Sequence, residues 1–260
     1  MPIGTAAPTA AELGRVPHHL VGFLDPHERY SAARFAHDAL AAIDAIHARG
    51  KRALVVGGTG FYLRALAGDV ALAGAYDPLL RERLAREARV HPPEVLHAWL
   101  AARDPVRASA IAPTDRYRVA RALEIALGPA SVQPAAMRAD AHESLRARGL
   151  AAVKLVLALD AETLEERIAR RVDGMLAAGF VAEAERVGSK AVAADAVGYP
   201  QAAAYLAGWL DEAGLRAAMI RATRRYAKRQ QTWFRGEPAA APLAADAVAV
   251  RLAALDGWSL

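Results

Sequence analysis

Short apolar runs and longer helical repeats alternate along the first part of the chain. Residues 18–21 are compatible with a short strand, and residues 53–56 form an apolar run that enters a glycine-rich turn, as a buried strand does. Between these runs, apolar residues recur at helical spacing at Phe35, Ala39, Ile43 and Ile46. Ser31 suits the N-cap of this helix and Gly50 suits its end. A second helix is expected to start near Phe61.

One further strand pattern lies beyond a long helical stretch. Residues 68–128 are charged and helical in pattern, and residues 129–150 are rich in proline and in small or polar residues. Residues 152–159 are apolar except for Lys154, which predicts a strand. The helix after it is predicted from apolar residues at Leu164, Ile168, Val172 and Met175, with Gly179 as its C-terminal stop.

This order of elements predicts an α/β fold. Its core is expected to be a parallel sheet made from residues 18–21, 53–56 and 152–159, with a helical domain inserted between two of the strands. The expected segments are the first part of the α/β core at 1–67, the helical insertion at 68–128, a connector at 129–150, and the second part of the core at 151–260.

Composition narrows the class of protein. A hydrophobic content of 54% over 260 residues is enough to build a core, and the absence of cysteine excludes disulfides, thiolate metal sites and a cysteine nucleophile. The sequence has no apolar run of about 20 residues and no secretory pattern after Met1, so we expect a cytoplasmic protein without a membrane partner. A formal net charge of +5 favours an anionic partner only if the charge is concentrated in one place.

The segment from Ile220 to Arg235 predicts a helix on which the charge is concentrated. At about 100° per residue, its cations fall within an arc of roughly 140°; they are Arg221, Arg224, Arg225, Lys228, Arg229 and Arg235. The opposite side carries Ile220, Ala222, Tyr226, Ala227, Trp233 and Phe234. Cations without an acid among them repel one another unless an anion neutralises them, which favours a contact surface for phosphate or nucleic acid. The alternative is a surface helix that pairs with acids from elsewhere in the chain. The position of the aromatic residues favours core packing over base stacking.

Several motifs at matching spacing resemble the tRNA dimethylallyltransferase family. The C-terminal signature of that family is similar to residues 223–235, and its Gly-Gly-Thr loop is similar to residues 56–62. Residues 4–9 resemble its Gly-Thr-x-Lys-Pro-Thr segment, and Gly198-Tyr199 resembles its Gly-Tyr motif. Further matches occur at Pro17-His18-His19-Leu20, Asp25-Pro26, Tyr30-Ser31, Phe35, Asp115, Arg118 and residues 121–124. The resemblance covers almost the whole chain.

The resemblance implies a fold and a reaction. The fold would be a P-loop-type, nucleotide-binding α/β core of the ATP-binding class, with an inserted helical domain that holds the tRNA anticodon stem-loop. The reaction would transfer a dimethylallyl group from dimethylallyl diphosphate to N6 of the adenosine beside the anticodon, in tRNAs that read codons beginning with U. Magnesium would stabilise the leaving diphosphate, and the protein would act as a cytoplasmic monomer. Such chemistry needs backbone N–H groups and cations around the diphosphate. It also needs the target adenine to be splayed out of its stack in the RNA.

The resemblance also assigns roles to individual residues. Thr59 is the matched residue at the channel where adenine meets the prenyl donor, and Arg224 is the matched arginine for the diphosphate, so these two form the catalytic expectation. Lys228 is expected to contact phosphate as well. The remaining expected tRNA contacts, besides Thr59, are Arg81, Tyr117, Arg118, Arg121, Gly198, Tyr199, Lys228 and Arg229.

The sequence departs from the family's pattern near its start. The family begins with a strand and a Gly-x-x-x-x-Gly-Lys-Ser/Thr loop, in which N–H groups and a lysine hold phosphate. Residues 57–60 are followed by Phe61-Tyr62, and Gly50-Lys51 is followed by Arg52, so neither segment qualifies. The family's Asp-Ser segment, whose aspartate is the proposed base, is also absent. We therefore expect residues 1–260 alone to have little activity, either because the gene model starts at an internal codon or because the gene is a degraded copy.

Smaller departures are local. Ala7 replaces the usual lysine of the Gly-Thr segment, Gln201 replaces a common acidic residue, and Gly128-Pro129 replaces Gly-Lys. Two other functions compete with prenyl transfer: a non-catalytic RNA-binding remnant of the same family, and a small-molecule phosphotransferase. The phosphotransferase is disfavoured because no lysine-containing phosphate loop is present. The absence of a Gly-x-Ser-x-Gly elbow and of a His-Glu-x-x-His motif argues against an α/β-hydrolase and excludes a zincin.

Overall fold

A computed structural model describes residues 1–70, 72, 77–128, 143–237, 240–244 and 247–254. The chain forms two compact units, one made of Met1–Ala67 with Ser144–Leu260 and the other of Gly68–Glu143. Residues 129–142 of the expected connector lie outside the described part. No helix among the described residues is long and apolar enough to cross a bilayer. The expected tRNA-binding role of residues 68–128 stays a prediction.

The N-terminal part of the first unit consists of α1 (Ala10–Arg15), α2 (Ala32–His47) and α3 (Gly60–Ala67). The Ser31 side chain accepts a hydrogen bond from the Arg34 backbone N–H and so caps α2, as the sequence predicted. The apolar face of α2 packs Leu40 and Ile43 against Leu66 of α3. The Tyr62 hydroxyl donates to the Tyr30 carbonyl oxygen at 2.6 Å and fixes α3 to the segment before α2.

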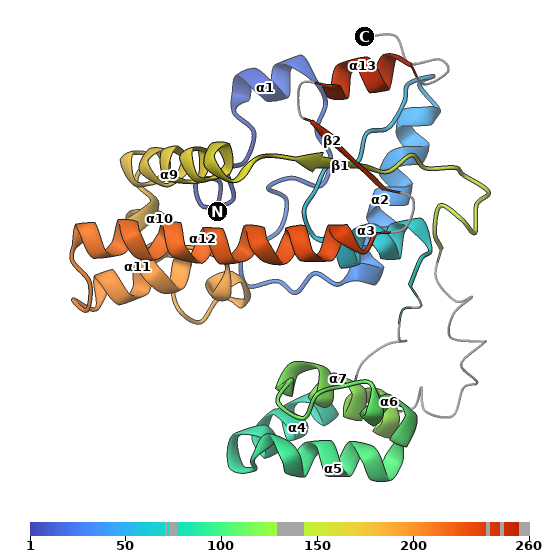
Figure 1. The fold of residues 1–260 in the computed structure, drawn as a ribbon, viewed down its shortest axis with the longest axis vertical. Helices are drawn as coiled ribbons and strands as arrows, with labels where there is room; N and C mark the ends of the chain where they lie inside the picture. Colours follow the sequence, from blue (N-terminus) through green and yellow to red (C-terminus); the bar gives the residue numbers. More distant parts are fainter. Residues whose placement is uncertain (71, 73–76, 129–142, 238–239, 245–246, 255–260) are drawn as a thin grey trace. The chain divides into compact units, whose positions relative to one another are not determined.

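The sheet is smaller than the sequence predicted. It consists of two parallel strands, β1 (Leu155–Ala158) and β2 (Ala241–Ala244), with Leu155 opposite Ala241 (Figure 1). The expectation of a strand within 152–159 is confirmed, but the expectations at 18–21 and 53–56 are wrong. Leu20 has a φ of 57°, in the left-handed region that a strand cannot contain. No strand among the described residues pairs with residues 53–56, and three apolar side chains of this segment are exposed.

The two strands are connected by a helical crossover that holds the main core. It runs through α9 (Ala161–Ala177), α10 (Phe180–Val187), the 3₁₀ turn η2 (Val192–Asp195), α11 (Tyr199–Leu206) and α12 (Glu212–Arg235). Helices α9 and α12 lie side by side (Figure 1). Phe180, Leu215 and Met219 meet in the core between them. Gly179 takes a φ of 89° just after α9, which confirms its predicted role as a stop. Helix α13 (Val248–Ala253) follows β2.

A buried carboxylate joins the N-terminal turn to this core. Glu183 of α10 is 2% exposed and accepts hydrogen bonds from the backbone N–H of Ile3 at 3.0 Å and of Gly4 at 2.8 Å. It also accepts from the Tyr199 hydroxyl at 2.7 Å. A side chain at Gly4 would collide with the Tyr199 ring, so glycine is required there. Burial alone would raise the pKa of Glu183, but the hydrogen bonds outweigh it and hold that pKa below its ordinary value.

The second unit is a small helical bundle. Its helices are α4 (Pro78–Val90), α5 (Pro93–Arg103), α6 (Pro105–Ser109) and α7 (Arg116–Leu127). Side chains of Asp77, Asp104 and Asp115 cap α4, α6 and α7, which explains why each of these helices starts where it does. Leu84, Leu100 and Leu123 are buried in its core.

The Glu183 contacts predict a defined loss of stability. Glu183→Gln replaces an acceptor of two backbone N–H groups with an amide that can accept from only one side, so we expect the free energy of unfolding to fall by about 2–3 kcal/mol. Because the folded-state pKa is lowered, the carboxylate's contribution is present above about pH 4.5 and is lost as the pH falls through the folded pKa. Denaturant unfolding at pH 7 and at pH 4 measures both effects. Glu185→Gln, an exposed change on the same helix, is the control, and equal losses in the two variants would contradict the prediction.

Candidate functional site

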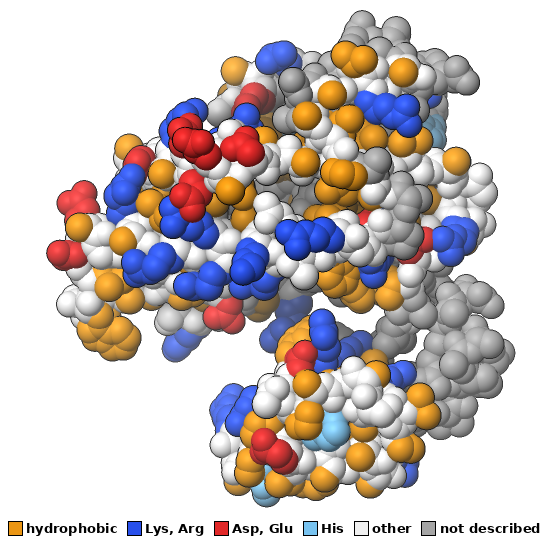
Figure 2. Space-filling model, in the orientation of Figure 1, with side chains coloured by type: hydrophobic (Ala, Val, Ile, Leu, Met, Phe, Trp, Pro, Cys, Tyr) orange, Lys and Arg blue, Asp and Glu red, His pale blue; other side chains and the backbone are white. Residues whose placement is uncertain are grey.

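The polar face of α12 carries exposed cations, as the helical wheel predicted. Asp211 starts the helix by accepting from the Gly214 N–H at 2.7 Å, and Leu215, Met219 and Ala222 fix its buried side. All six cations of the predicted arc are exposed, whereas Ile220, Ala222, Ala227, Trp233 and Phe234 are at least partly buried. Tyr226 of the predicted apolar face is exposed instead. Figure 2 shows Lys and Arg side chains in a row along α12.

The cations of α12 fall into paired and unpaired groups. Arg216 makes two contacts with Asp173 of α9, at 2.6 and 2.8 Å, and Arg224 lies 3.1 Å from Glu165 of the same helix. Arg225 and Lys228 make no ion pair with any described residue. The alternative interpretation, pairing with acids elsewhere, therefore holds for Arg224 but not for the centre of the basic face. The Arg224 pair is exposed and contributes at most about 1 kcal/mol, so Arg224 can exchange Glu165 for another anion.

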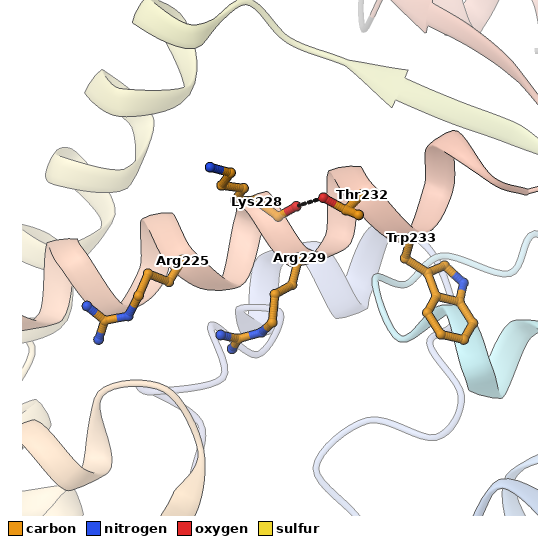
Figure 3. Close-up of a pocket in the computed structure, with 5 residues that line it drawn as sticks. All are labelled: Arg225, Lys228, Arg229, Thr232 and Trp233. Carbon is orange, nitrogen blue, oxygen red and sulfur yellow. Dashed lines mark hydrogen bonds between the residues drawn. The ribbon is translucent and has the colours of Figure 1, made fainter. Parts of the chain in front are cut away.

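An open hollow of about 590 Å³ lies on the C-terminal half of this face. It is lined by Arg225, Lys228, Arg229, Thr232 and Trp233. In Figure 3, Arg225 and Arg229 extend on one side of α12 and Lys228 on the other. The Thr232 hydroxyl donates to the Lys228 carbonyl oxygen at 2.9 Å. Three cations around one open hollow suit a ligand that carries several negative charges.

The Gly-Gly-Thr loop lies directly against the end of α12. The Gln230 side-chain amide donates to the Gly58 carbonyl oxygen at 3.1 Å. A side chain at Gly58 would collide with Gln230, and one at Gly60 would collide with the indole of Trp233. Thr59, between the two glycines, is exposed, and its carbonyl oxygen accepts from the Tyr62 N–H at the start of α3. The loop with Thr59 thus lies against α12, the helix that carries the basic face, although loop and helix end are about 170 residues apart in sequence.

Glu237 fixes the end of α12 to two other segments. Its carboxylate, 6% exposed, lies 2.7 Å from Arg64 Nε of α3 and 2.7 Å from Lys154 Nζ, just before β1. The Arg64 guanidinium also stacks over the Trp233 ring at 4.8 Å. Burial would raise the pKa of Glu237, but hydrogen bonds from Lys154 and Arg64 lower it below its ordinary value. This cluster was not predicted from the sequence; the one signal for it was Lys154, which interrupts an otherwise apolar run.

In the second unit, the residues expected to contact tRNA differ in how exposed they are and in whether an acid of the chain already binds them. Tyr117 is 82% exposed, and the Arg118 side chain is 69% exposed and only loosely paired with Asp115 at 3.4 Å. Arg81 and Arg121 instead hold the buried carboxylate of Glu124, at 3.1 and 2.7 Å. The Arg121 contact is close but not directed as a hydrogen bond, since that carboxylate oxygen has no hydrogen-bond partner among the described residues. These two arginines therefore have a structural task within the chain.

Gly198 and Tyr199 lie inside the first unit. Both are buried, and the Tyr199 hydroxyl is occupied by Glu183. Gly198 has a φ of 102° and its missing side chain leaves room for Phe180. Asp195 and Pro200 on either side are exposed. A contact with RNA at this turn would therefore involve its flanks, and the expected roles of Gly198 and Tyr199 stay predictions.

The described residues contain no group of three or more His, Cys, Asp or Glu side chains that could hold a metal ion. They do not fit a protein-built metal cage. The expected magnesium stays a prediction, and the chemistry below uses only residues of the chain.

Comparison with known proteins identifies the class. The family model for IPP transferases matches residues 1–237. The chain belongs to this family.

The relatives are consistent with one another. The chain is 43% identical to a tRNA dimethylallyltransferase from Thiobacillus denitrificans over 98% of its length and 83% of the relative's. It is 44% identical to a tRNA dimethylallyltransferase from Alkalilimnicola ehrlichii, over 91% and 76%. These relatives are prenyltransferases, and the chain is an enzyme of that class.

Solved structures agree with the fold. The tRNA isopentenylpyrophosphate transferase of Bacillus halodurans matches with a TM-score of 0.61 at 34% identity, over 94% of this chain and 77% of that one. A eukaryotic dimethylallyltransferase, solved in crystallographic snapshots of its action on tRNA, matches with a TM-score of 0.69 at 27% identity, over 90% and 60%. The expected α/β class is confirmed in its coarse form, as a mostly helical fold with a small parallel sheet.

The unpaired cations of α12 predict an effect on anion binding. Arg225→Gln with Lys228→Gln removes two cations that no described acid neutralises. We expect affinity for a single-stranded RNA to fall, and the slope of log affinity against log salt to flatten by about 1.4. A salt titration by fluorescence anisotropy measures this. Arg216→Gln, whose partner Asp173 already neutralises it, is the matched control. Equal slopes in the double variant and the parent would contradict the prediction.

Proposed function

We propose that this chain transfers a dimethylallyl group from dimethylallyl diphosphate to N6 of the adenosine beside the anticodon, in tRNAs that read codons beginning with U. The observation that carries the proposal is the hydrogen bond that holds the Thr59 loop against α12, the helix that carries the cationic face, since loop and helix come from two motifs similar to the family's. The names of the relatives, tRNA dimethylallyltransferases at about 40% identity, support the same reaction.

The geometry supports a division of work around the diphosphate. Arg224, Lys228 and Arg225 would hold its negative charge as the bond to the prenyl carbon breaks, because preorganised cations stabilise charge that develops in the transition state. Thr59 is exposed in the loop that contacts α12, and its hydroxyl would orient the acceptor amine or the donor. Magnesium would accompany the diphosphate oxygens, as this ion prefers phosphate and water ligands.

The tRNA would be held by both units. Tyr117 and Arg118 offer an exposed ring and cation for RNA, where stacking and phosphate contacts are the common modes of recognition. Lys228 and Arg229 would contribute from α12. We propose a monomer, because the residues expected to hold the diphosphate and the tRNA all lie on one chain.

A second function has support from the same surfaces. A non-catalytic RNA-binding protein needs only the α12 face and the exposed end of α7, and neither depends on a phosphate-binding loop. Residues 1–260 contain no Gly-x-x-x-x-Gly-Lys-Ser/Thr segment. We therefore propose that these residues alone bind tRNA and transfer prenyl groups slowly.

Prenyl transfer to tRNA distinguishes the two functions. We expect residues 1–260 to be at least about 1,000-fold slower than a form preceded by a family-type phosphate loop and Asp-Ser segment, since a set of N–H donors and a base are supplied only there. In the loop-bearing form, Arg224→Ala should lower kcat by about 100-fold. Arg216→Ala, which breaks an equivalent pair with α9, should leave it within about threefold. Equal turnover by the two forms would refute the proposed division of work, and no transfer by either would favour the RNA-binding function.

Replacing Arg118 and replacing Arg121, both on α7, should have two different effects. Arg118→Ala should weaken tRNA binding and reduce the salt slope by about one unit without changing the melting temperature, because its pair with Asp115 is exposed. Arg121→Ala should lower the free energy of unfolding by about 1–3 kcal/mol, because buried Glu124 loses one of its two partners. Thermal unfolding and a salt titration of tRNA binding separate the effects. An Arg118 variant that binds normally at low salt would show that this residue is not a tRNA contact.

A further inference from the structure

The loop that carries Thr59 has one direct polar link to α12. Among the described residues, this link is the hydrogen bond that the Gln230 side-chain amide donates to the Gly58 carbonyl oxygen, at 3.1 Å. Thr59 itself is exposed. An exposed side chain is not held in place by packing, so the direction of the Thr59 hydroxyl depends on the backbone of its loop. That backbone is fixed through Gly58 on one side and Gly60 on the other.

We infer that Gln230 is a positioning residue that sets the place of Thr59. This inference rests on the proposed function, in which Thr59 faces the reacting groups. Gln230 acts through the Gly58 carbonyl and makes no contact with substrate. Its close approach is possible only because position 58 is glycine, where a side chain would overlap the amide group of Gln230.

Trp233 supports the other side of the loop. Its indole lies where a side chain at position 60 would be, and its ring nitrogen is buried without a hydrogen-bond partner among the described residues. Leaving a buried donor unpaired costs about 1–3 kcal/mol, so the indole is kept for its shape and for its contact with Arg64, not for a hydrogen bond. Gly60 therefore rests on a rigid surface, while Gln230 supplies the directional contact.

The position of Gln230 is itself fixed by contacts at the end of α12. It lies in the last two turns of α12, whose end is tied by Glu237 to Arg64 of α3 and to Lys154 before β1. Since α3 starts at Gly60, the same cluster restrains both the helix that donates the hydrogen bond and the helix that follows the loop. The loop between them has little freedom once the Gln230 contact is made.

A spectroscopic test addresses the position of Thr59 without any need for activity. The protein is labelled with ¹³C at threonine methyl groups, and the Thr59 signal is assigned with Thr59→Ser. Gln230→Met keeps the length of the side chain but removes the donor, and Gln231→Met makes the same change at an exposed neighbour. We expect the Thr59 signal to move or broaden in Gln230→Met and to stay unchanged in Gln231→Met. An unchanged Thr59 signal in Gln230→Met would overturn the inference.

Kinetics of the form preceded by a phosphate loop and Asp-Ser segment give a second, independent test. Gln230→Met should lower kcat by about 10- to 100-fold, since a displacement of about 1 Å has such effects, while the KM for tRNA stays within about twofold. In a Thr59→Ala background the same change should cost less than about threefold, because residues that act as a unit are not additive. A full additional loss would show that Gln230 acts independently of Thr59. If no form transfers prenyl groups, the proposed function fails, and the methyl signal alone decides the inference.

Discussion

The carboxylate of Glu237 holds together the part of the molecule on which the site depends. It lies between Arg64 of α3 and Lys154 before β1, and thereby joins three segments that are distant in sequence. A carboxylate that is almost fully buried must be neutralised, and breaking such a cluster costs about 3–5 kcal/mol because an uncompensated charge remains. The two-stranded sheet is too small to fix the end of α12 by itself. The ion cluster does so, and with it the relation of α12 to the loop at 57–60.

The same logic recurs at two other buried acids. Glu183 holds the N-terminal turn through backbone N–H groups, and Glu124 holds Arg81 and Arg121 in the helical unit. Each buried carboxylate adds polar contacts between segments that are distant in sequence. The lowered pKa values of Glu183 and Glu237 follow from this arrangement, because hydrogen bonds to the charged form outweigh the effect of burial.

Local features of this fold could be read from the sequence, and non-local ones could not. Helical spacing and the capping residue Ser31 predicted α2, since both depend on neighbours within about one turn. The strand expected at 53–56 failed because a strand exists only where another pairs with it, and the apolar pattern does not reveal the partner. Strand β2 was missed for the converse reason, as Ala-Pro-Leu-Ala is a weak strand sequence that is fixed by its parallel neighbour. In the site, the basic face was predicted, but the roles of Gln230 and Glu237 required the folded geometry.

The arginines and lysines of this chain differ mainly in whether an acidic side chain is paired with them. Arg64, Arg81 and Arg121 are committed to buried acids, and their removal would act first on stability. Arg225 and Lys228 repel one another at the surface unless an anion binds, and the exposed Arg118 is held only loosely by Asp115. A sequence motif matches paired and unpaired cations equally, because it records the type of each residue and not the acid that the residue contacts in the fold. Arg224 is intermediate in character, since its exposed pair with Glu165 is weak enough to be exchanged for another anion, such as the diphosphate of the proposed reaction.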